Sequence, residues 1–447
     1  MRVAAALSIT CWSFTADAFS ILKHQTHVSA NKHGQEEIGC PRRPHSCHYS
    51  TSTATSSSTP SPEINRQQKP ENEQKEIPSG EAYSTLTLLE HMHLLTPNVH
   101  QTSTSNESKG IIDLFVNTMG FGLDPKSIGS VNNQSGVVFL NCGASQLHLN
   151  DDNNYCQKME TLQEDMQGTN SDNPAYEVGL RYNNLSLLKE ELSKAGSICS
   201  YKIIDEGSDR ETIRVTDTHG RIFVARESKN VENGNPDQPT ISSICQQKVI
   251  HSAKEDISEY GPGIVETYGA ASPPMCQGID YIEFFVSVPK DDDGNTMEKI
   301  AKFYDFFFDA PTNVANDGTS HIAIIGFGKI DDNGRAEQSL LFRERLCDNP
   351  PAAGGVVNDV GLGTGHHIAV YVGADDDDFE VAAENCMEGG LLWANSQFDD
   401  RVLDVDSAME IKQFRVKDII DIETGDVLYV LEHEIRSVSH SLFPGTK

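Results

Sequence analysis

A pattern of one strand, one helix and further strands recurs four times and constrains the fold of this chain more than any other feature. Each unit opens with a short apolar strand, continues with an amphipathic helix and closes with strands separated by Gly, Asn and Asp turns. His91 and Glu177 in the first two opening strands are 86 residues apart, as are Tyr281 and His367 in the last two. Constant offsets predict an internal duplication of a two-unit domain. The opening strands are expected at 85–95, 176–182, 280–288 and 366–372.

The repeat predicts two domains in tandem. The first two units form an N-terminal domain over residues 81–228, and the last two form a C-terminal domain over 277–437. Residues 229–276 are polar and contain several prolines, which is typical of an interdomain segment, and 438–447 form a tail.

The N-terminus has the features of a targeting sequence. Residues 1–18 carry a basic residue, an apolar run and small residues in A-x-A register, which predicts a signal peptide cut after Ala18 that is too short for a membrane span. Residues 19–80 are rich in Ser and Thr and are expected to be a transit peptide or a disordered linker. The stretch "ADAFSI", with Phe19 after the cleavage site, resembles the bipartite plastid presequences of diatoms and related algae. This resemblance implies a plastid (chloroplast) location. The alternative is secretion, in which case the sequons at Asn106, Asn133 and Asn184 would be glycosylation sites.

The repeated unit resembles a known superfamily. The opening strands "EHMHLLTPN" and "HHIAVYV" and the closing hairpins "TDTHGRIFV" and "DIETGDVLYV" are similar to those of the vicinal oxygen chelate (VOC) superfamily of glyoxalases, bleomycin-resistance proteins and extradiol dioxygenases. The resemblance implies an α+β fold of four βαβββ modules paired into two VOC domains. Each domain would be a curved mixed sheet around a cleft with helices outside, and the metal ligands would come from the first and last strands of the modules.

The VOC ligand positions, taken one at a time, imply a metal site in the N-terminal domain. They fall on His91, His148 and Glu177, while the fourth falls on Val224, which cannot bind a metal. Two imidazoles and one carboxylate suit Fe, Mn, Zn or Ni as a divalent ion and leave positions open for substrate oxygens.

Other polar residues on these strands have two possible roles. His93 shares a strand face with His91, and Gln146 shares one with His148, so they either orient the ligands and line the cleft or simply pack. Glu432 lies seven residues after the turn Gly425. Strict alternation predicts that its side chain lies on the face opposite the ligand position, unless a β-bulge intervenes.

In the C-terminal domain the equivalent positions do not form a metal site. They fall on Tyr281, a position near Leu340, His367 and Tyr429, of which only His367 is a good ligand. We therefore expect no catalytic metal there, and this departure from the extradiol dioxygenases argues against ring cleavage. Either the tyrosines, His366 and His367 line a pocket for an organic ligand, or this domain only packs on the first.

The leading functional hypothesis is a metal-dependent enzyme of the glyoxalase/dioxygenase type that chelates two adjacent oxygens of a small organic substrate. A lyase or isomerase is favoured over a ring-cleaving dioxygenase. The alternatives are a metal-free ligand-binding or sequestering protein of the bleomycin-resistance type, and a degenerate structural protein that acts by dimerisation, for example as a homodimer. A net charge of −31 argues against nucleic acid as a partner.

Overall fold

The structure is a computed structural model of the full chain. The expectations for residues 1–81, for the segment 229–275, and for His366, Asn106 and Asn133 lie outside the residues that it describes. The described residues are 82–96, 99, 110–124, 127, 130–131, 136–143, 145–151, 176–208, 210–228, 276–331, 334–348, 367–395 and 402–443.

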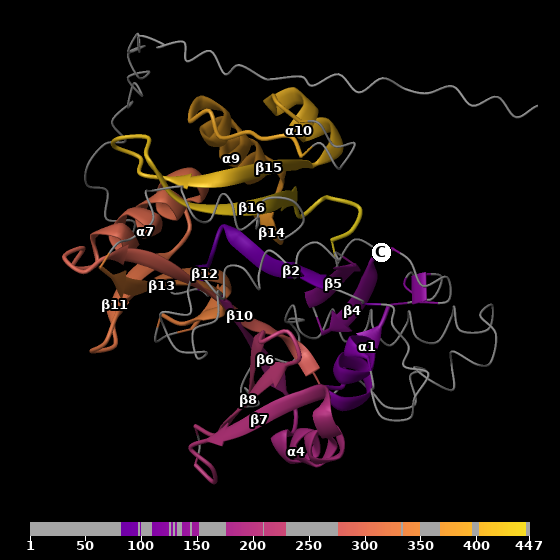
Figure 1. The fold of residues 1–447 in the computed structure, drawn as a ribbon. Coiled ribbons are helices and arrows are strands. Elements are labelled where there is room, and N and C mark those ends of the chain that lie inside the picture. The colour runs from indigo at the N-terminus through magenta and orange to yellow at the C-terminus, as the bar shows by residue number, and fades with distance from the viewer. Residues whose placement is uncertain are drawn as a thin grey trace, which may run out of the picture. The chain divides into compact units, whose positions relative to one another are not determined.

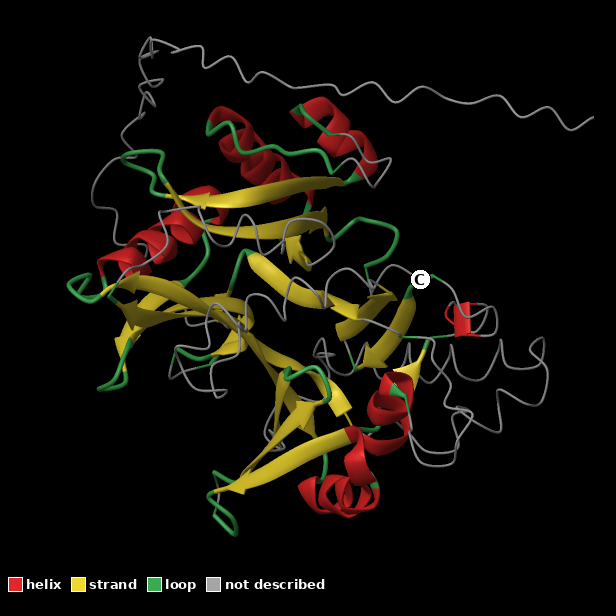
Figure 2. Ribbon diagram, in the orientation of Figure 1, coloured by secondary structure: helices red, strands yellow, loops and turns green. Residues whose placement is uncertain are grey.

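The described strands form two mixed sheets, each made from two βαβββ modules (Figures 1 and 2). In each sheet the first strands of two modules lie side by side and antiparallel, and each first strand pairs in parallel with the last strand of its own module. The expected α+β fold of four paired βαβββ modules is therefore confirmed.

The first sheet, which we call the 1/4 sheet, joins the first and fourth modules in the order β15-β16-β14-β2-β5-β4-β3. Figure 1 shows the indigo strands of the N-terminal module beside the yellow strands of the C-terminal one. Its strands are β2 (Leu86–Thr96), β3 (Gly122–Leu123), β4 (Val138–Cys142), β5 (Ser145–Asp151), β14 (His367–Val372), β15 (Gln413–Ile420) and β16 (Val427–Ser437).

The second sheet, the 2/3 sheet, joins the second and third modules in the order β1-β12-β13-β10-β6-β9-β8-β7, with β11 beside β12. Its strands are β1 (Ala82–Tyr83), β6 (Tyr176–Tyr182), β7 (Cys199–Ile204), β8 (Thr212–Asp217), β9 (Ile222–Glu227), β10 (Cys276–Pro289), β11 (Thr312–Asn316), β12 (His321–Ile330) and β13 (Ala336–Cys347).

This pairing corrects the predicted domain organisation. β2 of the first module pairs with β14 of the fourth, where Ala369 lies opposite His91, and β6 of the second pairs with β10 of the third, where Glu283 lies opposite Glu177. The predicted domains 81–228 and 277–437 therefore do not correspond to the two sheets. All four first strands are rich in apolar side chains and present the same kind of backbone N–H and C=O groups at their edges, so the local pattern does not specify which edge pairs with which.

Two of the helices that follow first strands begin at side-chain caps. The side chain of Asn184 accepts hydrogen bonds from the N–H groups of Ser186 and Leu187 at the start of α4, and Asp375 caps α9 in the same way. Acidic residues in the first turn of α9 also suit the positive end of the helix dipole. The helical segments are α1 (Ile111–Asp113), η1 (Leu114–Thr118), α4 (Leu185–Lys194), η2 (Gly196–Ile198), α7 (Asn295–Phe308), α9 (Asp376–Glu388) and α10 (Val405–Ile411).

Helix α7 links the two sheets. It contacts β11, β12 and β13 of its own sheet and also β15 and β16 of the 1/4 sheet. Its Tyr304 lies against Phe342 and donates a hydrogen bond of 2.7 Å to Nε2 of His433 in β16. None of the helices that the structure describes has the length and hydrophobicity of a membrane span.

Candidate metal centre

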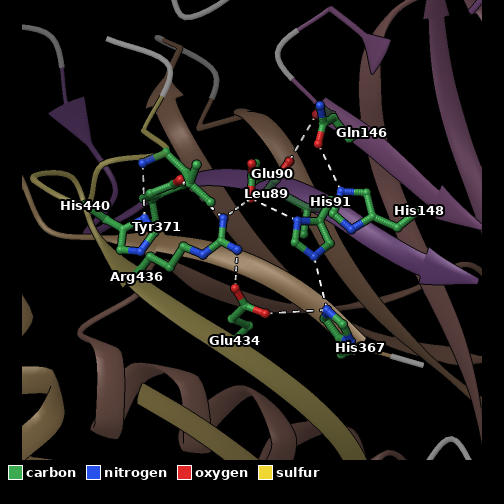
Figure 3. Close-up of polar contacts among 12 residues, drawn as sticks. Leu89, Glu90, His91, Gln146, His148, His367, Tyr371, Glu434, Arg436 and His440 are labelled. Carbon is green, nitrogen blue, oxygen red and sulfur yellow. Dashed lines mark hydrogen bonds and ion pairs between the residues drawn. The ribbon is translucent and has the colours of Figure 1, made fainter. Parts of the chain in front are cut away.

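Four imidazole rings gather within the 1/4 sheet, contributed by three neighbouring strands. His91 and His93 come from β2, His148 from β5 and His367 from β14. The ring of His91 stacks on that of His148 with centroids 3.8 Å apart and lies edge-on to that of His367 at 5.2 Å. Figure 3 shows these three rings with the charged residues around them.

Two of these histidines and one glutamate form a group that could hold a metal ion. The Nε2 atoms of His91 and His367 are 3.1 Å apart, and Nε2 of His367 is 3.5 Å from Oε2 of Glu434 in β16. One donor atom from each of the three residues lies within 4.8 Å of the others, and all three residues are buried. Two ligand atoms that each lie about 2.1 Å from one cation, with an angle of roughly 90° between them at the cation, would be about 3 Å apart. The separation of the two nitrogens therefore fits a shared cation.

Glu90 sets the tautomer of His91. Its Oε2 lies 2.9 Å from Nδ1 of His91, so Nδ1 carries the proton and Nε2 presents its lone pair towards His367. A carboxylate on the far nitrogen is a common feature of metal-binding histidines, because it fixes the ring and makes it more basic. Glu90 reaches His91 because it is the extra residue of a β-bulge, where His91 and Leu89 lie opposite the consecutive residues Ala369 and Val370.

Two buried arginines bind the carboxylates of the centre. Arg436 pairs with Glu434 and, at 2.6 Å, with Glu90. Arg415 pairs with Glu434 at 2.7 Å and with Glu432 at 2.8 Å. Although burial alone would raise the pKa of Glu434, the guanidinium groups of Arg436 and Arg415 hold it well below its usual range. Three carboxylates and two guanidinium groups therefore surround the imidazole nitrogens.

His148 is placed beside the group rather than in it. Its Nε2 donates a hydrogen bond of 2.9 Å to Oε1 of Gln146, whose amide nitrogen in turn donates to Asp124 and Asn141. The ring stacks face to face on His91, whereas two ligands of one ion point their nitrogens at a common centre. Burial lowers the pKa of His148 well below its ordinary value, and the neighbouring imidazoles lower it further. His148 therefore acts on the centre by packing against His91.

His93 is buried with neither ring nitrogen hydrogen-bonded by any described residue. Burial lowers its pKa to about 3, so the ring is neutral at physiological pH. Its ring is edge-on to those of His367 and His148, with centroids 4.8 Å and 6.0 Å away.

Glu177, the third predicted ligand, does not join this cluster. It lies in the 2/3 sheet, where its Oε1 accepts a hydrogen bond of 2.6 Å from Tyr281 and its Oε2 is 3.4 Å from Arg214. The predicted set of His91, His148 and Glu177 is therefore corrected, because the second module pairs with the third and not with the first. Burial and the neighbouring Glu177 raise the pKa of Tyr281 far above its ordinary value.

The remaining predicted residue, Tyr429, is buried beside Phe284 and Phe342 of the 2/3 sheet. His367, expected in a domain without a catalytic metal, instead belongs to the group that could hold a metal ion.

The sequence pattern did not indicate Glu90, Glu434 or the two arginines of the centre, and the predicted orientation of Glu432 was wrong. β16 carries one extra residue between Val430 and His433, a β-bulge that shifts the alternation of its side chains. Glu432 is consequently buried and bound by Arg415 and Asn395 instead of facing the opposite way. The available signal was the pair of glutamates in "EHE", residues 432–434, on a strand otherwise rich in apolar residues.

Comparisons with solved structures give fold likenesses of low identity. A Bacillus subtilis protein assigned as a dioxygenase has a TM-score of 0.39 at 11% identity, covering 80% of this chain and 86% of its own. A halotolerant catechol dioxygenase has a TM-score of 0.22 at 12% identity, covering 79% and 87%. A glyoxalase/bleomycin resistance protein/dioxygenase family enzyme from Burkholderia phytofirmans has a TM-score of 0.20 at 10% identity, covering 31% and 97%. No protein-family model and no curated protein matches the chain.

Proposed function

We propose that this chain is a metal-dependent enzyme in which His91, His367 and Glu434 hold a divalent cation that binds a small organic molecule through two adjacent oxygens. The observation that carries the proposal is the convergence of three buried donor atoms from three strands, with a nitrogen separation of 3.1 Å that suits neighbouring ligands of one ion. When bound, the cation would supply Lewis-acid chemistry and, if it is iron, access to dioxygen.

The protein's own residues would prepare the centre. Glu90 keeps Nε2 of His91 unprotonated, so that its lone pair can bind the cation, and Arg436 pairs with both Glu90 and Glu434. His148 packs against the face of His91 and limits the rotation of its ring.

The donor set favours oxygenase chemistry over lyase chemistry, which reverses the preference drawn from the sequence. The sequence favoured a lyase because His367 had neither a second histidine nor a glutamate beside it at the expected ligand positions. The pairing of the first and fourth modules places His91 and Glu434 beside His367 and so supplies the missing histidine and glutamate. Two histidines and one carboxylate that leave positions open are the ligand set of non-haem iron(II) oxygenases.

A second candidate, a metal-free ligand-binding protein, has one observation in its favour. Both oxygens of Glu434 are already bound by guanidinium groups, Oε1 by Arg436 and Oε2 by Arg415. The centre is therefore electrostatically compensated without a cation, as a sequestering protein would require.

Metal analysis separates the two candidates. The full chain is reconstituted anaerobically with iron(II) and freed of loosely bound metal, and the iron per chain is measured. We expect about one iron per chain in the parent and in Glu177→Gln, and a loss in His91→Ala, His367→Ala and Glu434→Gln. An iron-free parent contradicts the enzyme proposal and favours the sequestering protein. An iron-loaded parent that consumes oxygen with catechols supports the oxygenase, and turnover of methylglyoxal–thiol adducts without oxygen uptake supports a lyase instead.

A further inference from the structure

His93 is a buried polar residue without a visible hydrogen-bond partner in the described part of the chain. It is 5% exposed, and neither Nδ1 nor Nε2 has a hydrogen-bond partner among the described residues. His91 and His148, on the neighbouring positions of the sheet, each have a polar partner that fixes one nitrogen.

A buried polar group without a partner is costly, and such groups in folded proteins are nearly always satisfied. An apolar residue of similar size would fill the position without this cost. An imidazole at this position is therefore suited to a polar partner that is not among the described residues, such as a bound molecule.

The position of His93 places that partner beside the candidate metal centre. His93 follows His91 by two residues on β2, and its ring is edge-on to the ring of His367 at 4.8 Å between centroids. It is not one of the three residues whose donor atoms converge. A molecule held at the cation by two oxygens would thus have His93 next to it.

We propose that His93 is a substrate-binding residue that hydrogen-bonds an oxygen of the small organic molecule held at the cation. The inference rests on the proposed function above and narrows its substrate class to molecules with a hydroxyl or an ionised oxygen at the chelating end. A neutral imidazole has one N–H and one lone pair, so it can donate to an oxyanion or accept from a hydroxyl group. Molecules that present only hydrocarbon at this point would leave the imidazole unsatisfied and bind more weakly.

Binding of a chromophoric vicinal diol, nitrocatechol, to the cobalt(II)-loaded full chain tests the role of His93 without turnover. Cobalt affinity and nitrocatechol affinity are measured separately, by absorbance and under anaerobic conditions. His93→Phe removes the hydrogen bond, and His93→Gln keeps a donor and an acceptor. His219→Phe is the matched control, because His219 lies in the turn between β8 and β9 of the 2/3 sheet.

We expect His93→Phe to bind cobalt as the parent does and to bind nitrocatechol about 10-fold to 100-fold more weakly, as for a lost hydrogen bond to a charged group. His93→Gln should stay within about threefold of the parent because it restores the contact. His219→Phe should match the parent for both ligands. If His93→Phe does not fold, His93→Leu provides the same test.

Two outcomes overturn the proposal on their own. If His93→Phe loses cobalt to the same extent as His91→Ala, then His93 is a metal ligand. If it binds nitrocatechol like the parent, then His93 is a core residue. A parent chain that binds no cobalt would instead contradict the proposed function itself, and with it the substrate-binding role of His93.

Discussion

The side-chain amide of Gln338 in the 2/3 sheet hydrogen-bonds both main-chain groups of Leu89 in the 1/4 sheet. Oε1 accepts from the N–H of Leu89 at 3.0 Å, and Nε2 donates to its C=O at 3.1 Å. Nε2 also lies within hydrogen-bond distance of Ile279 O and Ser145 Oγ. Leu89 precedes Glu90, the extra residue of the bulge, so this amide holds the backbone where β2 turns a carboxylate towards His91.

Replacing Gln338 by Leu should destabilise the protein strongly. The change leaves the buried main-chain groups of Leu89 and Ile279 without this partner, and unsatisfied buried groups cost about 1–3 kcal/mol each. We expect the free energy of unfolding, measured by urea denaturation of the metal-free chain, to fall by about 3–5 kcal/mol. Gln277→Leu, in a partly exposed position on β10, should change it by less than about 0.5 kcal/mol. Equal effects of the two substitutions would contradict the role of Gln338.

Replacing Glu90 by Gln should weaken metal binding without abolishing it. The amide can still accept the His91 N–H, but the negative charge next to the imidazole, which would help to stabilise a bound cation, is lost. We expect metal affinity, measured by competition with a chromophoric chelator, to fall by about 10-fold to 100-fold. Glu283→Gln removes a comparable buried carboxylate, bound by Arg343 in the 2/3 sheet, and should leave metal affinity unchanged. An unchanged affinity in Glu90→Gln would show that Glu90 does not tune His91.

His433 should make the metal-free protein less stable in acid. Burial lowers its pKa to about 4, below the value of 6.5 expected in the unfolded chain. Below about pH 6.5 the unfolded state therefore binds one more proton, and stability falls by up to about 1.4 kcal/mol per pH unit until the pH nears the folded pKa. His433→Gln does not titrate, so we expect its loss of stability between pH 7 and pH 4.5 to be smaller than that of the parent by about 2.5 kcal/mol. Urea unfolding at both values checks this, and parallel losses would exclude His433 as the source.

The glycosylation state of the mature chain distinguishes a plastid location from secretion. We propose a plastid location through a signal peptide followed by a transit peptide, in which case the mature chain should lack glycans. Asn184 is a good reporter, because it is exposed at the start of α4 and only its amide oxygen caps the helix. Mass spectrometry of the protein from its native source should find Asn184 unmodified. A glycan on Asn184 would favour secretion.

The sequence predicted the elements of the fold better than it predicted their pairing. The first strands expected at 176–182 and 280–288 are found at Tyr176–Tyr182 and Cys276–Pro289, close to where apolar periodicity placed them. His91 was predicted as a ligand from its place in a first strand, and it is one of the three residues whose donor atoms could hold a metal ion. Glu177 occupies the same kind of position but lies with Tyr281 in the other sheet.

The sequence by itself determined that this chain forms four βαβββ modules, because side-chain periodicity within a strand or helix is a local property. Only the tertiary structure decided that the first module pairs with the fourth, which brings His367 and Glu434 to His91. Four similar strand edges compete for the same partners, and the choice among them depends on contacts between residues far apart in the chain, such as Gln338 and Leu89. The β-bulges in β2 and β16 turn the side chains of Glu90 and Glu432 towards the centre. A strict alternation of side chains between the two faces of a strand would not have predicted this orientation.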